Sequence, residues 1–190
     1  MKGTLFLIVG PSGSGKSSVL MELKKSHPEY TYPLSATTRP MRPGEKEGDI
    51  YHFYSHDEFK QHVERGDFLE YAVVHQDHYY GLIKQPVIEA LQRGEIVVRE
   101  VDIQGFESIR NAISKEDLVT IFITAPNQEE LIERIRGRAP IDDDELKKRL
   151  VSMRAELSKA RECDYLVENK NGALADTVAR VVKIIQETRS

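Results

Sequence analysis

The feature that most constrains this chain is a buried apolar run that leads directly into a glycine-rich segment. The run is Leu5–Val9, and the segment Gly10–Ser17 reads G-P-S-G-S-G-K-S. This matches the spacing G-x-x-x-x-G-K-[ST], in which a strand turns sharply into a helix. We therefore expect a strand over Thr4–Val9 and a helix from Gly15 to about Ser26.

A loop of this kind is suited to binding phosphate. Its glycines let the backbone curl so that N–H groups point inward, and the start of the helix adds positive potential. Lys16 can reach β- and γ-phosphates, and the Ser17 hydroxyl is placed to ligate Mg²⁺. A glycine-rich turn can also join a strand to a helix without a ligand, but the Lys-Ser ending favours a nucleoside triphosphate. The predicted ATP-binding residues are Gly10, Pro11, Ser12, Gly13, Ser14, Gly15, Lys16, Ser17 and Ser18.

The rest of the chain alternates β-rich apolar runs with helical patterns. Such alternation predicts an α/β fold with a parallel sheet between two layers of helices. Two helical stripes should pack in the core, Leu146-Leu150-Met153-Leu157 and Leu174-Val178-Val181-Ile185. The expected further strands are Ile96–Val101, Leu118–Thr124 and Tyr165–Val167, and the expected helices are Pro86–Arg93, Gln104–Ala112, Asn127–Arg136, Asp142–Ala160 and Leu174–Glu187.

One stretch, from Leu34 to about Gln85, interrupts this alternation with Pro, Gly, Tyr, His and charged residues. We expect an insertion there, built from short antiparallel strands and a small helix near Asp57–Arg65. The predicted layout is a single domain of 190 residues with a core (1–33, 84–125 and 160–190), an insertion (34–83) and a lid (126–159).

The insertion carries candidates for holding a phosphorylated acceptor. Arg39 and Arg42 lie three apart in a proline-stiffened loop, and their planar forks suit phosphate. Tyr51 and Tyr80 could add phenolic donors. Glu70 could accept both donors of the guanine edge, since an ionised carboxylate only accepts hydrogen bonds. Alone, each feature is also compatible with a solvated turn or a surface glutamate.

Two further groups of charged residues flank the core runs. Glu100 and Asp102 follow an apolar run, where ligands gather in open α/β sheets, so they could bind a Mg²⁺-water or the acceptor, or cap the next helix. The arginines Arg134, Arg136, Arg138 and Arg149 bracket a break between helices. They form either a solvated face or a flap that closes over the transferring phosphoryl group.

Composition excludes other classes. Net charge is −4, which disfavours a nucleic-acid coat, and the longest apolar run is too short for a membrane span. The single cysteine, Cys163, allows no intrachain disulfide and suits a reducing compartment, so we expect a cytoplasmic protein.

Taken together, the ordered motifs resemble the guanylate kinase family from Leu5 to about Ile185. The resemblance rests on the glycine-rich loop and on these further matches: Ser35-x-Thr37-Thr38-Arg39-x-x-Arg42-x-Gly44-Glu45-x-x-Gly48, Tyr51-x-Phe53, Phe68-Leu69-Glu70, Tyr79-Tyr80-Gly81, Asp102-x-Gln104-Gly105, Arg136-Gly137-Arg138, Arg149-Leu150 and Asp164-Tyr165-x-x-x-Asn169.

The resemblance implies transfer of the γ-phosphoryl group of ATP to GMP or dGMP, with Mg²⁺, in a monomer or homodimer. It implies that Lys16, Arg39, Arg138 and Arg149 are catalytic and that Asn169 lies near the adenine of ATP. It also implies a metal contact of Glu100 through water. The implied GMP-binding residues are Ser35, Arg39, Arg42, Tyr51, Glu70, Tyr80 and Asp102.

Two positions depart from the family pattern. Leu82 stands where the family has Ser or Thr, whose hydroxyl helps to bind guanine, and Ala139-Pro140-Ile141 replaces a glycine followed by polar residues. Leu82 leaves room for a related kinase with another acceptor, such as a ribose bisphosphate, which an acceptor panel would reveal. A non-catalytic binding module is disfavoured because Lys16, Arg39 and Arg42 are all present.

Overall fold

The computed structural model describes residues 2–49, 51–74, 78–138 and 143–189. By packing, the chain divides into two compact units. The first comprises Met1–Leu5, Thr31–Val97 and Gln104–Leu118, and the second comprises Phe6–Tyr30, Val98–Ile103 and Val119–Ser190.

The main sheet has four strands in the order β6-β1-β7-β8. All six residues of β1 are buried, as are four consecutive residues of β7, Thr120–Ile123. Continuous burial, rather than alternation, is typical of strands covered on both faces. The strands are β1 (Thr4–Val9), β6 (Ile96–Glu100), β7 (Leu118–Thr124) and β8 (Tyr165–Glu168), which confirms the predicted runs within one residue.

Strands β7 and β8 pair in parallel, with Ile121 opposite Tyr165. A carboxylate fixes the start of β8. Asp164 Oδ2 accepts bonds from the backbone N–H of Thr120 (2.8 Å) and from its hydroxyl (2.6 Å). The end of β8 is held as well, because Asn169 N–H donates to Thr124 O at 2.7 Å. The residue that follows β8 therefore has a fixed position.

The second unit contains the helices α1 (Lys16–Ser26), α5 (Gln128–Arg138), α6 (Asp143–Ser158) and α7 (Leu174–Arg189), with a short 3₁₀ helix η2 (Lys159–Glu162). Helix α7 packs against α1 and buries Val178, Val181 and Ile185 of the predicted stripe. Leu174 differs from the prediction, because it is only partly buried and lines a pocket.

Helices α5 and α6 share a small apolar core. Leu131 and Met153 are buried there, and Leu150 and Leu157 pack against them. The predicted core stripe of α6 is thus confirmed at three positions. The side chain of its fourth member, Leu146, and the predicted first residue of the helix, Asp142, lie outside the described part.

The first unit contains α3 (Lys84–Gln92), most of α4 (Ile103–Ala112) and a 3₁₀ turn η1 (Lys115–Asp117). Helix α3 begins two residues before the predicted Pro86. Proline is tolerated there because the N–H groups of a first turn have no partner within the helix. Its buried side chains are Val87, Ala90 and Leu91.

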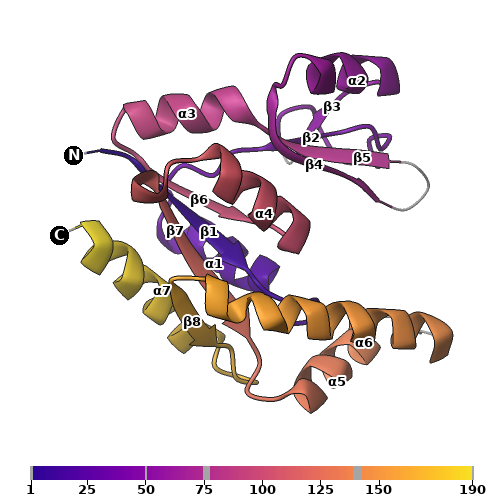
Figure 1. The fold of residues 1–190 in the computed structure, drawn as a ribbon, viewed down its shortest axis with the longest axis vertical. Helices are drawn as coiled ribbons and strands as arrows, with labels where there is room; N and C mark the ends of the chain where they lie inside the picture. Colours follow the sequence, from indigo (N-terminus) through magenta and orange to yellow (C-terminus); the bar gives the residue numbers. More distant parts are fainter. Residues whose placement is uncertain (1, 50, 75–77, 139–142, 190) are drawn as a thin grey trace. The chain divides into compact units, whose positions relative to one another are not determined.

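The insertion forms a second sheet in the order β3-β2-β5-β4, and α2 (His56–Glu64) lies across it (Figure 1). Its strands are β2 (Ser35–Thr37), β3 (Tyr51–Phe53), β4 (Phe68–Val74) and β5 (His78–Ile83). The predicted antiparallel pairing is confirmed for β2–β5 and β4–β5. It is wrong for β2–β3, which is parallel, because a long loop returns the chain to the starting end of β2.

A small aromatic core holds α2 to this sheet. Phe59 of α2 is fully buried and its ring stacks on Phe68 with 4.4 Å between centroids. Gly81 makes room for this contact, since a Cβ there would lie 2.9 Å from Phe68 Cδ1 and 3.0 Å from Phe59 Cζ. One face of the insertion sheet is therefore committed to packing.

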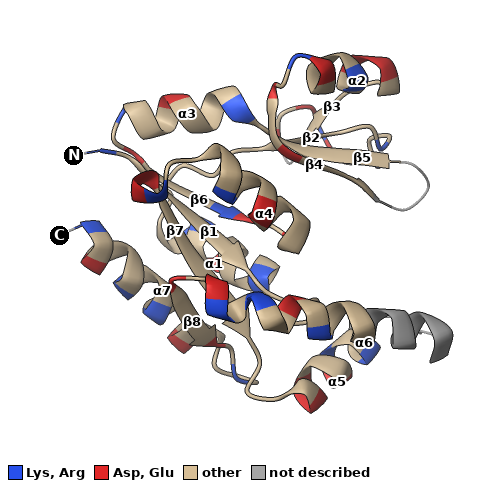
Figure 2. Ribbon diagram, viewed as in Figure 1, with Lys and Arg blue, Asp and Glu red and all other residues tan. Residues whose placement is uncertain are grey.

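Figure 2 shows basic and acidic residues scattered over the helices. Among the helices that the structure describes, none is long and apolar enough to cross a membrane.

Replacing Phe59 by Ala should lower the free energy of unfolding by about 3–5 kcal/mol, because a fully buried aromatic ring leaves a cavity. Urea denaturation followed by circular dichroism measures this. The neighbouring Lys60→Ala is the control, since Lys60 is exposed. Equal stability of the two variants would contradict the aromatic core.

Candidate functional site

The glycine-rich loop between β1 and α1 depends on a left-handed residue. Gly15 precedes α1 with φ +92°, a conformation that L side chains rarely adopt. There is also no space for one, since a Cβ on Gly15 would lie only 2.2 Å from Asn169 Nδ2. Glycine is therefore required at this position for two independent reasons.

The loop's carbonyl groups are bonded by side chains. Lys16 Nζ donates to Gly10 O (2.5 Å) and to Pro11 O (3.1 Å). Asn169 Nδ2 donates to Ser14 O at 2.8 Å, and Arg134 reaches Gly13 O at 3.5 Å. Since the carbonyls are engaged in this way, the backbone is held in the shape that presents its N–H groups to a ligand.

The first turn of α1 completes this anion site. Val19 N–H makes the first intrahelical bond, to Gly15 O at 3.0 Å, so the helix offers no acceptor to the amides of the three preceding residues. The first turn contains no acidic residue that would neutralise the helix dipole. This arrangement suits a phosphate group at residues Lys16, Ser17 and Ser18.

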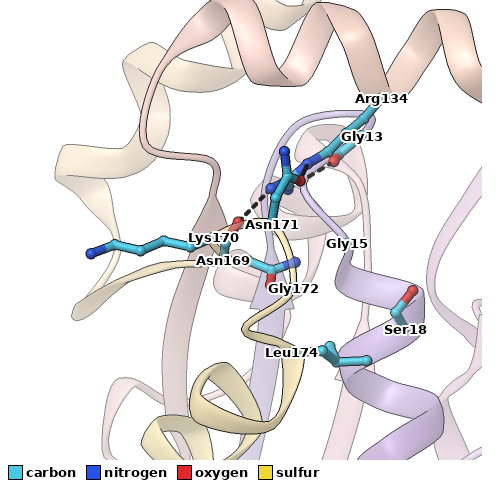
Figure 3. Close-up of a pocket in the computed structure, with 9 residues that line it drawn as sticks. All are labelled: Gly13, Gly15, Ser18, Arg134, Asn169, Lys170, Asn171, Gly172 and Leu174. Carbon is cyan, nitrogen blue, oxygen red and sulfur yellow. Dashed lines mark hydrogen bonds between the residues drawn. The ribbon is translucent and has the colours of Figure 1, made fainter.

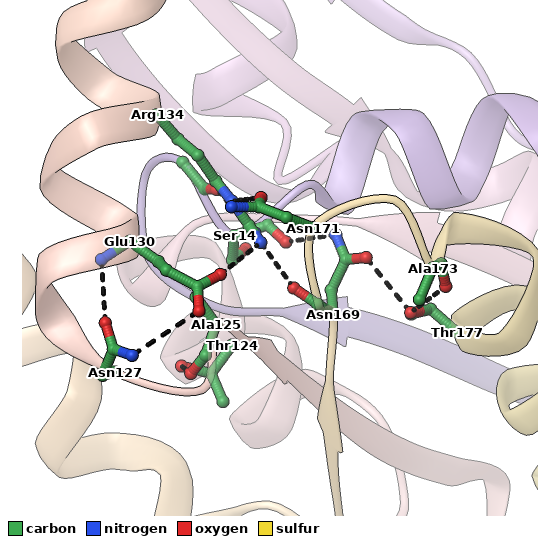
Figure 4. A network of polar contacts seen from close by, with 11 residues as sticks. Ser14, Thr124, Ala125, Asn127, Glu130, Arg134, Asn169, Asn171, Ala173 and Thr177 are labelled. Atoms are coloured by element: carbon green, nitrogen blue, oxygen red, sulfur yellow. Dashed lines mark hydrogen bonds and ion pairs between the residues drawn. The ribbon is translucent and has the colours of Figure 1, made fainter.

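Asn169 is the centre of a polar network (Figure 4). It is buried, and while its amide group donates to Ser14 O, its Oδ1 accepts from the Thr177 hydroxyl at 3.1 Å. Both ends of the carboxamide are thus engaged. The side chain of Asn169, which was predicted to lie near the adenine of ATP, therefore holds the loop from the residue after β8.

A pocket of about 300 Å³ opens beside the loop (Figure 3). Arg134 of α5 borders it, with Nη2 donating to Asn169 O (2.7 Å) and Nε to Asn171 Oδ1 (2.9 Å). A planar guanidinium held in this way can stack on a base. The lining residues are Gly13, Gly15, Ser18, Arg134, Asn169, Lys170, Asn171, Gly172 and Leu174.

The predicted magnesium residues suit a metal delivered with a nucleotide. Ser17 is exposed in the first turn of α1. Glu100 Oε2 is buried and has no hydrogen-bond partner among the residues that the structure describes, which is the environment that a metal-bound water would satisfy. Within the described ranges there is no group of three His, Cys, Asp or Glu residues that could hold a metal by itself. Such a metal would therefore need phosphate oxygens as further ligands.

The lid arginines are only partly described. The side chains of Arg138 and Arg149, both predicted to be catalytic, lie outside the described part, and so do Ala139, Pro140 and Ile141. Arg136 is exposed on α5. Arg134 does reach the loop; it was named among the lid arginines but was not assigned to the ATP or GMP site.

In the first unit, strand register brings most predicted acceptor residues to one face of the insertion sheet. Ser35 lies opposite both Tyr51 and Leu82, and Leu82 lies opposite Glu70. Directly opposed residues point to the same side of a sheet. Tyr80 is two residues from Leu82 and shares this face, whereas α2 packs on the other. We call this the acceptor face: Ser35, Thr37, Tyr51, Phe53, Glu70, Ala72, Tyr80 and Leu82.

A β-bulge places Glu70 on the acceptor face. Phe68 pairs with Ile83, but Glu70 pairs with Leu82, so the register shifts between them. In a regular strand, residues two apart point to the same face. Because of the bulge, Phe68 can stack on Phe59 while Glu70 points to the opposite side.

The arginine loop is organised around Glu45. Arg39 makes a bidentate pair with Glu45, at 2.9 Å for each bond, and Glu45 also accepts the backbone N–H of Arg42 at 2.8 Å. The Arg39 guanidinium, followed by the Arg42 backbone N–H, lowers the pKa of the Glu45 carboxyl. Arg39 also lies over the rings of Tyr51 (5.7 Å) and Phe53 (5.5 Å), so it borders the acceptor face.

Arg42 and Asp102 complete the predicted set. Both side chains are exposed, Arg42 on the loop of the first unit and Asp102 after β6 in the second. Sequence reasoning did not assign a role to Glu45 or to Glu156, which the structure places against Arg39 and the glycine-rich loop. Glu45 could have been found from the sequence, because it follows Arg39 and Arg42 at short spacing in the same loop.

A strand–loop–helix phosphate cradle on a parallel sheet, with a polar insertion and a helical hairpin, defines a P-loop nucleotide-binding protein. The family model described as guanylate kinase matches residues 2–188. The chain is 40% identical to the guanylate kinase of Thermotoga maritima over 190 residues, covering 100% of this chain and 89% of the relative. It is 38% identical to that of Xanthomonas euvesicatoria pv. vesicatoria, covering 100% and 91%.

A solved structure agrees with these sequence matches. The crystal structure of guanylate kinase from Anaplasma phagocytophilum superposes with a TM-score of 0.74 at 25% identity, covering 98% of this chain and 86% of that one. The chain belongs to the guanylate kinase family.

Gly15→Ala should weaken binding of a non-hydrolysable ATP analogue at least about tenfold. The left-handed conformation costs about 1–2 kcal/mol for a residue with a Cβ, and the clash with Asn169 adds to this. Isothermal titration calorimetry measures the effect. The control is Gly137→Ala, because a Cβ there meets none of the described atoms within 4 Å. Normal binding by the Gly15 variant would refute the role of this turn.

Proposed function

We propose that this protein transfers the γ-phosphoryl group of ATP to GMP or dGMP, giving ADP and GDP. The observation that carries the proposal is the acceptor face. There, Ser35 of β2 and Glu70 of β4 lie on either side of Leu82 of β5. A carboxylate that accepts two donors selects guanine, because adenine and the pyrimidines lack adjacent N1–H and N2 amino groups. Family membership supports the same acceptor.

The donor nucleotide binds in the second unit. The loop amides between Gly10 and Ser18, including that of Ser12, and the ammonium of Lys16 hold the phosphates, and the pocket beside Arg134 takes the adenine. Lys16 must leave the carbonyls of Gly10 and Pro11 to reach the phosphates. The free loop therefore keeps this lysine close to the place where it acts.

The acceptor is held in the first unit. Arg39 and Arg42 clamp the GMP phosphate with Tyr51 and Tyr80 as further donors, while Ser35 and Glu70 read the base. The ion pair with Glu45 fixes the Arg39 fork before GMP arrives, so less side-chain entropy is lost on binding. Asp102 is assigned to the acceptor as well, on the family resemblance.

Transfer is direct and in line, without a phospho-enzyme, and the acceptor phosphate is already ionised, so no strong general base is needed. The protein contributes positioning and neutralisation of charge on the phosphates. Ser17, and Glu100 through a water, would hold Mg²⁺, which would offset the negative charge of the ATP phosphates. Arg138 and Arg149 approach the transferring group from the lid.

Three broader assignments accompany this function. The chain has three functional parts, namely a core (1–33, 84–125 and 160–190), a GMP-binding insertion (34–83) and a lid (126–159). It acts in the cytoplasm on small nucleotides, without nucleic acid or membrane partners, as a monomer or a homodimer.

The function is tested by a coupled ADP assay with ATP, Mg²⁺ and a panel of acceptors. GMP and dGMP should be phosphorylated at least about 100-fold more efficiently than AMP, because the base-reading carboxylate would be left unpaired by adenine. The panel also includes IMP and ribose phosphates. A preference for a ribose phosphate would show that GMP is not the natural acceptor. Binding of the ligands without any production of ADP would indicate a binding module.

The control variant for this assay is Lys16→Ala. It should lower kcat with GMP by about 100- to 1,000-fold, as expected when one preorganised cation is lost from the transition state. The exposed Lys25→Ala should retain activity. A near-normal kcat for the Lys16 variant would show that the ADP came from another enzyme or another site.

Leu82 offers a sharper test of base recognition, since it is fully buried between Ser35 and Glu70. Leu82→Thr should lower the KM for GMP by about two- to tenfold compared with Leu82→Val, because the two replacements have similar shape and only Thr offers a hydroxyl worth about 0.5–1.5 kcal/mol. Both should be less stable than the natural protein. Identical KM values for the two variants would place Leu82 away from the bound base.

A further inference from the structure

Helix α6 brings a carboxylate to the phosphate loop. Glu156 Oε2 accepts the backbone N–H of Ser12 at 3.2 Å. Glu156 is partly buried, and it lies three residues from Met153, which anchors α6 in the core shared with α5. The contact therefore connects the hairpin of α5 and α6 to a backbone amide of the loop that binds phosphate.

The position of this carboxylate is defined by one peptide unit. The carbonyl of the Pro11–Ser12 peptide accepts a hydrogen bond from Lys16 Nζ (3.1 Å), and the N–H of the same peptide donates one to Glu156. Lys16 also attracts the Glu156 carboxylate electrostatically. The carboxylate therefore takes up a loop amide that a phosphate oxygen could bond, at a peptide unit whose carbonyl holds the phosphate-binding lysine.

We propose that Glu156 is a specificity-determining residue that competes with the terminal phosphate of ATP for the Ser12 amide and for Lys16. It occupies the γ-phosphate end of the loop in the nucleotide-free protein, and a triphosphate displaces it. The inference rests on the proposed function, since it takes ATP as the donor.

The electrostatic environment explains why this carboxylate can be displaced. Burial raises the pKa of Glu156; Lys16 and the Ser12 amide oppose that rise, and Asp102 adds to it. The raised pKa means that the carboxylate form of Glu156 is less stable here than it is in water. A phosphate brings more negative charge to the same donors, so exchange of one anion for the other is favourable.

The competition has a consequence for the lid. When a phosphate takes the Ser12 amide, Glu156 loses its hydrogen bond to the loop. The apolar core that α6 shares with α5 remains. Binding of a triphosphate is thereby coupled to release of α6. A diphosphate, which lacks the terminal group, leaves Glu156 in place.

The test compares Glu156→Gln with the natural protein, because Gln keeps the shape and an acceptor oxygen but removes the charge. Isothermal titration calorimetry measures Kd for a non-hydrolysable ATP analogue and for ADP, both with Mg²⁺ and without GMP. The variant should bind the ATP analogue about three- to tenfold more tightly, with less than about twofold change for ADP, since only the γ-phosphate meets Glu156. Glu133→Gln, an equal charge change at an exposed position of α5, should alter neither Kd.

An unchanged or weaker affinity for the ATP analogue, or an equal gain for ADP, overturns the competition. Thermal denaturation of the free proteins checks that the variant is folded, and a merely structural contact would lower the melting temperature without changing the ratio of the two Kd values. If the natural protein binds neither nucleotide, the proposed function itself is wrong, so the two failures are distinguishable.

Discussion

The second unit depends on one constraint, which is that the glycine-rich loop must keep its N–H groups turned toward a ligand. A loop in that conformation points its carbonyls away from the ligand, and buried carbonyls need partners. Three side chains supply them, namely Asn169 after β8, Arg134 on α5 and Lys16 within the loop. The phosphate site is therefore built from the strand, the lid hairpin and the loop together, and the same reasoning explains the tight approach of Asn169 to Gly15.

The first unit meets a different requirement, which is to pack one face of a very small sheet while Tyr51, Glu70 and Tyr80 on the other face stay partly exposed. Gly81 allows Phe59 and Phe68 to stack against the packed face. The bulge beside Leu69 then turns Glu70 to the acceptor face, next to Ser35 and Leu82. The proposed recognition of the base and the stability of the insertion thus both depend on a single irregularity in β4.

Much of this could be predicted from the sequence because the signals are local. The run before Gly10 correctly predicts β1, and the Lys-Ser ending of the loop predicts a phosphate site. The stripe of Val178, Val181 and Ile185 correctly predicts the buried side of α7. The parallel pairing of β2 with β3 was missed, because strands of three residues carry little periodicity and their pairing depends on the path of the loop between them.

The sequence by itself determined the α/β class, the loop with its lysine, and the residue types suited to phosphate and guanine, because each follows from spacing along the chain. Only the tertiary structure decided which of these groups meet. Three contacts join residues that are far apart in the chain. They are the strand register that aligns Ser35, Leu82 and Glu70, the hydrogen bond from Asn169 to Ser14 O, and the hydrogen bond from the Ser12 amide to Glu156. Such contacts arise from packing, and no local pattern encodes them.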